Sequence, residues 1–175
     1  MTAFKHRLPA TLSTARLVLT APKMAHAAAI AELCNNANVH KWIARLPFPY
    51  GLEDARFFIE QIVPSDEEAC YGLILDGALI GVVGLHLLGD EPAELGYWLG
   101  EPYWGHGYAT EAAQALIAAA RSAGATALGS RARTTNMASR NVLRKLGFVE
   151  TGKIIETDGN LEGQDMVLMS LDLTR

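Results

Sequence analysis

The sequence has few cysteines, and they are not arranged to hold a metal. The two cysteines, Cys34 and Cys70, lie in separate segments, and neither belongs to a C-x-x-C motif or lies near a pair of histidines. We therefore expect reduced, buried thiols in a cytoplasmic protein, with neither a disulfide nor a metal site.

Long apolar runs and an excess of positive charge are also missing. No run approaches the ~18 apolar residues of a membrane span, and the N-terminal MTAFKHRLPATLSTARL lacks the apolar stretch of a signal peptide. The formal net charge of −4 gives no reason to expect nucleic acid as a partner. Half of the 175 residues are hydrophobic and 19% are charged, so we expect one folded domain spanning residues 1–175.

The hydrophobic pattern predicts an α/β domain with the element order βααβββαβαββ. Strands are predicted at 16–20, 71–76, 78–87, 93–99, 127–134, 148–157 and 162–173, and helices at 24–34, 52–63, 109–120 and 137–146. Asp76-Gly77 is a strong hairpin signal between two of the strands. The strand–helix–strand unit over 93–134 requires part of the sheet to be parallel. Pro47 and Pro49 exclude a long helix from the aromatic segment 39–50.

A glycine-rich turn between a predicted strand and a predicted helix is the most informative stretch. Gly105 and Gly107 precede a helix whose apolar residues recur on one face. Backbone N–H groups at a helix start, with the helix dipole behind them, bind phosphate. Spacing alone leaves two interpretations open, an anion site and an ordinary turn. A dinucleotide fingerprint is incomplete, because Thr110 stands where the third glycine belongs, and no Walker lysine follows.

A second predicted helix start is also a candidate part of a ligand site. Asn136 and Ser139 open a basic amphipathic helix that ends at Lys145-Leu-Gly-Phe148. Alone, this is an N-cap followed by a polar first turn. The two helices should flank one sheet edge, however, so that their N-termini converge near the carboxyl ends of neighbouring strands, where open sheets bind ligands.

Together these stretches resemble the GNAT superfamily of acetyl-CoA-dependent N-acetyltransferases and, more closely, its Rim-type branch of ribosomal-protein alanine N-acetyltransferases. The matching stretches cover nearly the whole chain: Thr14-Ala-Arg16-Leu-Val-Leu, Leu46-Pro-Phe-Pro-Tyr50, Glu53-Asp54-Ala55, Glu94-Leu-Gly-Tyr97-Trp-Leu99, Trp104-Gly-His-Gly-Tyr-Ala-Thr-Glu111-Ala, Asn136-Met-Ala-Ser139 and Lys145-Leu-Gly-Phe148. The resemblance implies the GNAT fold, with a mixed, mostly antiparallel sheet that is flanked by helices and splayed between its fourth and fifth predicted strands.

The resemblance also implies acetyl-CoA as cosubstrate, no metal, and a cofactor site. The turn 104–110 would hold the CoA pyrophosphate by its backbone N–H groups, the strand 97–99 the pantetheine, and the second helix start the region near the thioester. The implied cofactor-binding residues are Tyr97, Trp98, Leu99, Trp104, Gly105, His106, Gly107, Tyr108, Ala109, Thr110, Asn136 and Ser139. The family often begins this turn with Gln or Arg, so Trp104 leaves most of the binding to the backbone. Arg140 and Arg144 either meet the adenosine phosphates or form a solvated helix face.

The resemblance points to two carboxylates as candidates for the catalytic base. Glu94 and Glu156 both occupy positions that hold acids in Rim-type relatives, and each is equally well explained as a structural strand carboxylate. Ser139 is the candidate acid for the CoA thiolate, since the tyrosine that many GNAT enzymes place after the Gly-Phe is missing between Phe148 and Arg175. His86 and His106 either relay protons or are structural.

The expected reaction is acetyl transfer to a primary amine, either the N-terminal α-amine of a protein or a small molecule. The aromatic segment 42–50 and the hairpin 158–164 are expected to shape the acceptor side, and a monomer or homodimer is expected. Two alternatives remain: a CoA-binding module without catalysis, which fits the missing tyrosine, and a nicotinamide dehydrogenase, which needs a full fingerprint.

Overall fold

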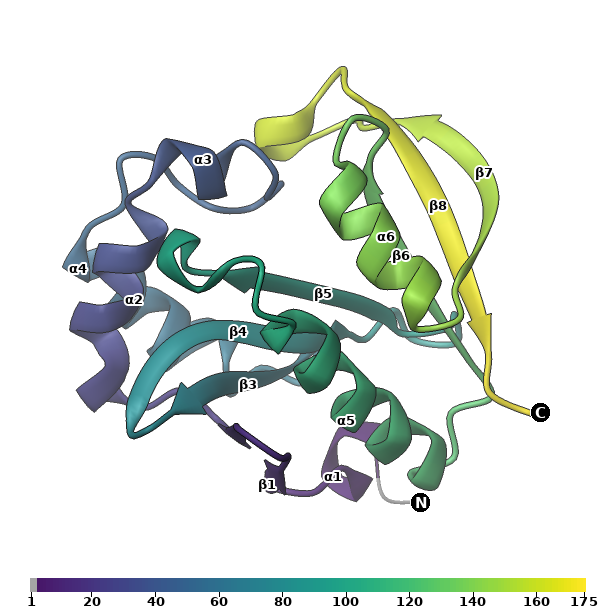
Figure 1. The fold of residues 1–175 in the computed structure, drawn as a ribbon, viewed down its shortest axis with the longest axis horizontal. Coiled ribbons are helices and arrows are strands. Elements are labelled where there is room, and N and C mark those ends of the chain that lie inside the picture. The colour runs from purple at the N-terminus through teal and green to yellow at the C-terminus, as the bar shows by residue number, and fades with distance from the viewer. Residues whose placement is uncertain (1–2) are drawn as a thin grey trace.

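One mixed sheet organises the protein, which we describe from a computed structural model of residues 3–175 (Figure 1). The strand order in the sheet is β1-β2-β3-β4-β5-β6-β8-β7. The strands are β1 (Thr11–Ser13), β2 (Val18–Thr20), β3 (Glu68–Leu75), β4 (Ala78–His86), β5 (Glu94–Leu99), β6 (Ala127–Arg133), β7 (Val149–Ile155) and β8 (Asp165–Asp172). The helices are α1 (Phe4–Arg7), α2 (Ala27–Cys34), α3 (Ala37–His40), α4 (Leu52–Phe57), α5 (Tyr108–Ser122) and α6 (Met137–Lys145), with short helical turns η1 (Met24–His26), η2 (Phe58–Ile62), η3 (Glu101–Tyr103) and η4 (Gly159–Leu161).

Helices cover both faces of the sheet and create two cores. In Figure 1, α5 and α6 lie across the near face, while α2, α3 and α4 gather at one end of the sheet. The alternation of side chains along β5 separates the two sides: Leu95, Tyr97 and Leu99 pack into the core beneath α5 and α6, whereas Trp98 packs into the core of α2 and α4. None of the helices among residues 3–175 is long and apolar enough to cross a bilayer.

Three predicted elements differ from those observed, each for a local reason. The predicted strand 16–20 is half of a hairpin, because the Thr14 hydroxyl accepts a hydrogen bond from the Leu17 amide (3.0 Å) and places Arg16 in the turn. The segment 39–50 contains the end of α3, which begins where the Asn36 side chain accepts from the Asn38 amide. The predicted helix 52–63 widens after α4 into a single π turn, η2.

The sheet opens between β5 and β6, which are the fourth and fifth predicted strands. These strands pair in parallel through Glu94 and Gly129, the single register pair found between them in the described chain, and every other neighbouring pair is antiparallel. Beyond that pair, the Ser130 hydroxyl of β6 donates to the Leu95 carbonyl of β5 (2.8 Å). The predicted mixed, mostly antiparallel and splayed sheet is therefore confirmed.

Candidate active site

The start of α5 lies beside this opening and presents backbone donors. Gly105 and Gly107 adopt left-handed φ angles of 76° and 81°, which residues with a Cβ rarely adopt. No side chain in the described chain caps the helix at Gly107, although the Asn136 side chain caps α6. The first amide groups of this 15-residue helix are thus left for an anion, with the positive end of the dipole behind them.

Trp104 anchors the turn to the end of β5. Its indole Nε1–H donates to the Leu99 carbonyl over 2.7 Å, and the side chain remains 40% exposed. This bond uses the only donor of the ring, so the Trp104 side chain holds the turn in place and has no donor left for a ligand. His106 is exposed on the same turn and stacks on Tyr108, their ring centroids being 5.8 Å apart.

The β1–β2 turn supports the same helix start from the other side. Glu111 in the first turn of α5 accepts from the Thr14 hydroxyl (2.9 Å) and from Nε of Arg16 (3.1 Å). The Arg16 guanidinium also lies 4.3 Å from the centre of the Tyr108 ring. Burial opposes ionisation of Glu111, but the hydrogen bonds from Thr14 and Arg16 and the charge of Arg16 outweigh it, so the pKa of Glu111 lies below its ordinary value of 4.5.

This lowered pKa predicts an acid-sensitive contribution to stability. A carboxyl whose pKa is lower in the folded state stabilises the fold fully above its ordinary pKa, and that stabilisation disappears as the pH falls through the folded value. Glu111→Gln should therefore lower the free energy of unfolding at pH 7, and the difference from the unmodified protein should shrink below pH 4.5. Urea unfolding at several pH values measures this; a difference that stays constant with pH would contradict it.

Hydroxyl groups meet on the α6 side of the opening. The Tyr97 hydroxyl of β5 and the Ser139 hydroxyl of α6 lie 3.0 Å apart, and the Asn136 side chain accepts from the Ser139 amide (3.2 Å). Burial raises the pKa of Tyr97, although the hydrogen bond with Ser139 works against it, so the phenol is protonated at neutral pH. Three residues that the sequence marked for the cofactor are thus brought together.

The two candidate carboxylates lie on the other side of the opening and share one arginine. Arg131 of β6 donates to Glu94 from Nε (2.6 Å) and Nη2 (3.1 Å), and to Glu156 from Nη1 (3.2 Å). Glu156 is only 8% exposed, and its other oxygen accepts from the Thr157 amide (3.2 Å). The hydrogen bond to Glu94 raises the pKa of Arg131; burial opposes this, and the charges of both carboxylates add to it, so the guanidinium stays charged.

Arg131 is the residue that sequence reasoning missed. Its strand alternates, with Leu128 and Ala132 buried on the α5–α6 side and Arg131 on the other. An arginine in the middle of an interior strand needs a partner of opposite charge, and this requirement was the signal in the sequence that could have identified Arg131. The three groups carry one net negative charge when both carboxylates are ionised, which favours a cationic amine nearby.

Three other candidate side chains already have partners in the protein. His86 lies opposite Glu94 in the β4–β5 register, but its Nδ1 is 2.6 Å from Glu68. Arg140 and Arg144 both bind Glu150, at 2.6 and 2.7 Å, but only the half-exposed Arg144 fits the interpretation of a solvated helix face, because the Arg140 side chain is largely buried.

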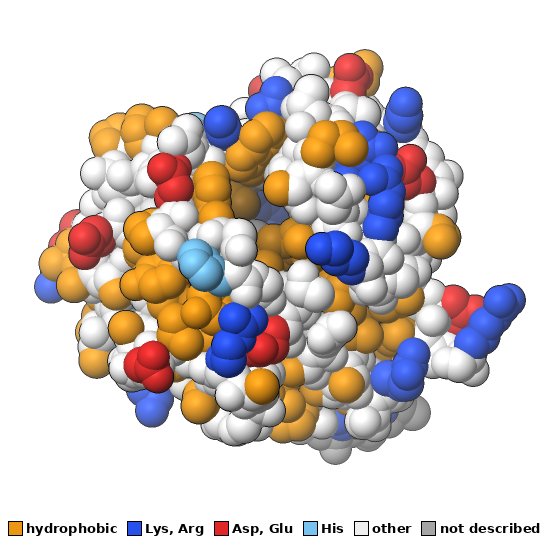
Figure 2. Space-filling view, viewed as in Figure 1, with side chains coloured by type: hydrophobic (Ala, Val, Ile, Leu, Met, Phe, Trp, Pro, Cys, Tyr) orange, Lys and Arg blue, Asp and Glu red, His pale blue; other side chains and the backbone are white. Residues whose placement is uncertain are grey.

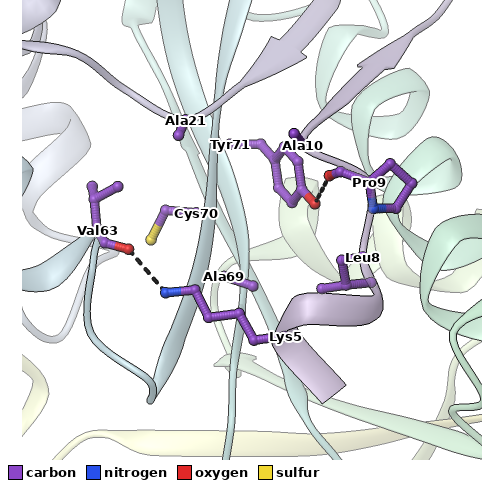
Figure 3. Close-up of a pocket in the computed structure, with 9 residues that line it drawn as sticks. All are labelled: Lys5, Leu8, Pro9, Ala10, Ala21, Val63, Ala69, Cys70 and Tyr71. Atoms are coloured by element: carbon purple, nitrogen blue, oxygen red, sulfur yellow. Dashed lines mark hydrogen bonds between the residues drawn. The ribbon is translucent and has the colours of Figure 1, made fainter. Parts of the chain in front are cut away.

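A separate cavity of about 150 Å³ lies away from these groups, between α1 and the β3 side of the sheet (Figure 3). Lys5 crosses it to donate to the Val63 carbonyl (3.2 Å), and the Tyr71 hydroxyl donates to the Pro9 carbonyl (2.6 Å). Cys70 on its wall is unpaired, and burial raises the pKa of its thiol to about 12. With its donors bound to backbone and its thiol protonated, this cavity lacks the groups for an anionic ligand.

The molecular surface is hollowed over the opening of the sheet. Figure 2 shows this hollow beside α6, facing the side from which α3 and the following segment approach. The backbone along β5 reaches it as well: the Ala93 and Leu95 carbonyls both point to β6, and alternation along the strand directs the amide groups of Tyr97 and Leu99 the same way. An uncapped helix start, free strand amides, a hydroxyl pair and a carboxylate cluster thus surround one opening.

A combination of this kind suits acyl transfer, and the comparisons with known proteins show the family to which the chain belongs. The sequence model of the acetyltransferase (GNAT) domain matches residues 16–149, so the chain belongs to the GNAT acetyltransferase family. YdaF of Bacillus subtilis (strain 168), provisionally named a ribosomal N-acetyltransferase, is 32% identical over 152 residues, which cover 77% of this chain and 78% of YdaF.

Two solved structures share the fold across almost the whole chain. RimL, a ribosomal L7/L12 α-N-protein acetyltransferase in complex with coenzyme A, matches with a TM-score of 0.83 at 20% identity, covering 93% of this chain and 97% of RimL. Mycobacterium smegmatis RimJ, in complex with a CoA disulfide, matches with a TM-score of 0.85 at 19% identity, covering 95% of this chain and 88% of RimJ. These structures show the shared fold, whereas the family model and the likeness to YdaF confirm the resemblance to the Rim-type branch, and the chain is an N-acetyltransferase of the GNAT family.

Proposed function

We propose that this protein transfers the acetyl group of acetyl-CoA to a primary amine, foremost the N-terminal α-amine of a protein. The observation that carries the proposal is the placement of two different kinds of group on the two sides of one sheet opening. The carboxylates Glu94 and Glu156 lie on one side, and the hydroxyl pair Tyr97–Ser139 lies on the other. The protein acceptor is supported by the names of YdaF and RimL.

The residues around the opening fit coenzyme A. The uncapped start of α5 suits a pyrophosphate, since Gly105 and Gly107 let the backbone approach an anion closely. Trp104, His106, Tyr108, Ala109 and Thr110 would contribute through their backbone. Tyr97 and Leu99 would offer strand amides to the pantetheine, whereas the Trp98 side chain faces the other core and its backbone lies opposite Val82 of β4, so Trp98 does not reach the opening. When bound, acetyl-CoA supplies an acyl group activated as a thioester.

Acetyl transfer requires four contributions from the protein. Binding places the amine about 3 Å from the acyl carbon, which is worth up to roughly 7–11 kcal/mol. Glu156, or Glu94, accepts the proton that the amine loses as its nitrogen bonds to the acyl carbon. The free amide groups along β5 stabilise the charge on the acyl oxygen. Ser139, hydrogen-bonded to Tyr97, gives a proton to the sulfur as the carbon–sulfur bond breaks.

The Tyr97–Ser139 pair takes the place of the tyrosine that is missing after Phe148. We expect Ser139→Ala to lower kcat about 10²-fold, the lower end of general acid catalysis, since a thiolate leaves readily. Tyr97→Phe should cost less, because Ser139 keeps its own proton. Steady-state rates at saturating acetyl-CoA measure both effects. Equal rates for all three proteins would remove the pair from the mechanism.

The test of the proposed function is the release of free thiol from acetyl-CoA with a panel of acceptors. The panel contains a peptide with a free α-amine, the same peptide with a blocked α-amine, a diamine and a free amino acid. Turnover with the unblocked peptide alone supports the protein acceptor, and turnover with a small amine moves the assignment to that class. Stabilisation by acetyl-CoA in a thermal shift without any thiol release would leave a CoA-binding module and contradict the proposal.

A further inference from the structure

Two segments that are distant in the sequence meet on the carboxylate side of the opening. The first is residues 41–46, between α3 and α4, and the second is the hairpin 156–165, which carries Glu156 at its start. Asn160 of η4 joins them: its backbone N–H donates to the Ala44 carbonyl (2.8 Å), and its side-chain Nδ2 donates to the carbonyls of Ile43 (3.1 Å) and Leu46. One residue thus satisfies three backbone carbonyls of the facing segment.

Gly159 makes this approach possible. Its φ is 69°, and a Cβ at this position would lie 2.4 Å from the Ala44 carbonyl oxygen, so no other residue fits without moving the segment. Leu161, on the other side of Asn160, is 3% exposed and fixes the hairpin in the core. Leu46 of the segment is also buried, in the core of α2 and α4, so both sides are anchored and the contacts of Gly159 and Asn160 fix the segment 41–46 against the hairpin.

Arg133 of β6 strengthens the same junction. Its Nη1 donates to the Lys41 carbonyl (3.2 Å), its Nη2 donates to the Gln164 side chain (2.8 Å), and its guanidinium lies 5.3 Å from the centre of the Trp42 ring. The Arg133 guanidinium therefore links β6 to the segment 41–46 and to the hairpin 156–165. The junction also adjoins the carboxylate cluster, because Gln164 and Gly163 pair with Glu156 through backbone hydrogen bonds of 3.0 and 2.8 Å.

We propose that Gly159 and Asn160 are positioning residues that hold segment 41–46 closed beside Glu156 and so fix the entrance of the acceptor amine. This inference rests on the proposed acetyl transfer. The junction lies on the hairpin that carries the carboxylate, whereas the anion site is built by α5 and its turn. Loosening the junction should therefore weaken use of the amine and leave the use of acetyl-CoA unchanged.

The turn between β4 and β5 offers a matched control. Gly159 and Gly89 both have left-handed φ angles, 69° and 71°, but a Cβ at Gly89 would meet no atom within 4 Å. Gly159→Ala and Gly89→Ala thus impose similar backbone strain, and only the first displaces Ala44. We expect Gly159→Ala to raise the KM for the amine by about tenfold or more, a misplaced acceptor being costly. The KM for acetyl-CoA should remain unchanged, and Gly89→Ala should behave like the unmodified enzyme.

A second measurement tests the junction without any activity. Lys41 and the exposed Arg45 make segment 41–46 a substrate for trypsin once it leaves the hairpin. Gly159→Ala and Asn160→Ala should be cut there faster than Gly89→Ala and the unmodified protein. Equal cleavage rates, or an equal amine KM in both glycine variants, would overturn the inference. If no amine is acetylated by the unmodified protein, the proposed function fails, while the cleavage rates still decide whether the junction holds the segment.

Discussion

Replacing Glu156 by glutamine is expected to lower kcat by about 10²- to 10⁴-fold, the range of general base catalysis. Glutamine keeps the size of the side chain and can still accept a hydrogen bond from Arg131, so the hairpin should remain folded, but the amide cannot take a proton from the amine. Rates at saturating acetyl-CoA and amine measure the effect. The KM for acetyl-CoA should stay constant, since Glu156 lies on the side away from the hydroxyl pair.

Glu94→Gln is the matched comparison for this variant. Both carboxylates bind Arg131, but Glu94 receives two of its donors at 2.6 and 3.1 Å, while Glu156 receives one at 3.2 Å. Each carboxylate accepts two hydrogen bonds, but one of those to Glu156 comes from the neutral Thr157 amide, so Glu156 is bound less strongly by the guanidinium and is better suited to accept a proton. We therefore expect the larger loss for Glu156→Gln. A larger loss for Glu94→Gln would exchange the two roles, and unchanged rates for both across pH would remove the carboxylates from catalysis.

Gly107→Ala is expected to weaken acetyl-CoA binding about 10- to 100-fold. Alanine disfavours the φ of 81° at the start of α5, so the first amide groups of the helix turn away from their common direction. Losing one hydrogen bond to a charged group costs about 1.5–3 kcal/mol, which corresponds to this change in affinity. Isothermal titration with acetyl-CoA measures it.

Gly89→Ala is the control for the cost of backbone strain. Gly89 lies in the turn between β4 and β5 with a φ of 71°, and a Cβ there would meet no atom within 4 Å. Both variants should lose similar thermal stability, and only Gly107→Ala should lose affinity. Equal affinities of the two variants for acetyl-CoA would show that the start of α5 does not hold the pyrophosphate.

Much of the fold followed from local sequence signals. Asp76-Gly77 placed the β3–β4 hairpin, and the glycine turn followed by an alanine-rich helix placed α5. The β1–β2 hairpin was missed because its turn depends on the Thr14 hydroxyl, a single side-chain hydrogen bond within a stretch that otherwise has strand character. The π turn after α4 has no comparable sequence signal.

The site was predictable where it depends on helix starts and unpredictable where it depends on contacts between distant strands. Asn136 and Ser139 share one turn of α6, so their proximity follows from helical spacing. Glu94, Arg131 and Glu156 come from β5, β6 and the end of β7, and only the register of the sheet brings them together. The junction of Asn160 with segment 41–46 spans more than a hundred residues and likewise leaves no local pattern.

Mass spectrometry of an acceptor peptide tests the central claim most directly. The protein is incubated with acetyl-CoA and two peptides of equal sequence, one with a free and one with a blocked α-amine, neither containing lysine. We expect one acetyl group on the α-amine of the free peptide, with one CoA thiol released for each acetyl group transferred, and no change in the blocked peptide. Failure to acetylate this peptide or any small primary amine, at acetyl-CoA concentrations that saturate the protein, would contradict acetyl transfer at this site.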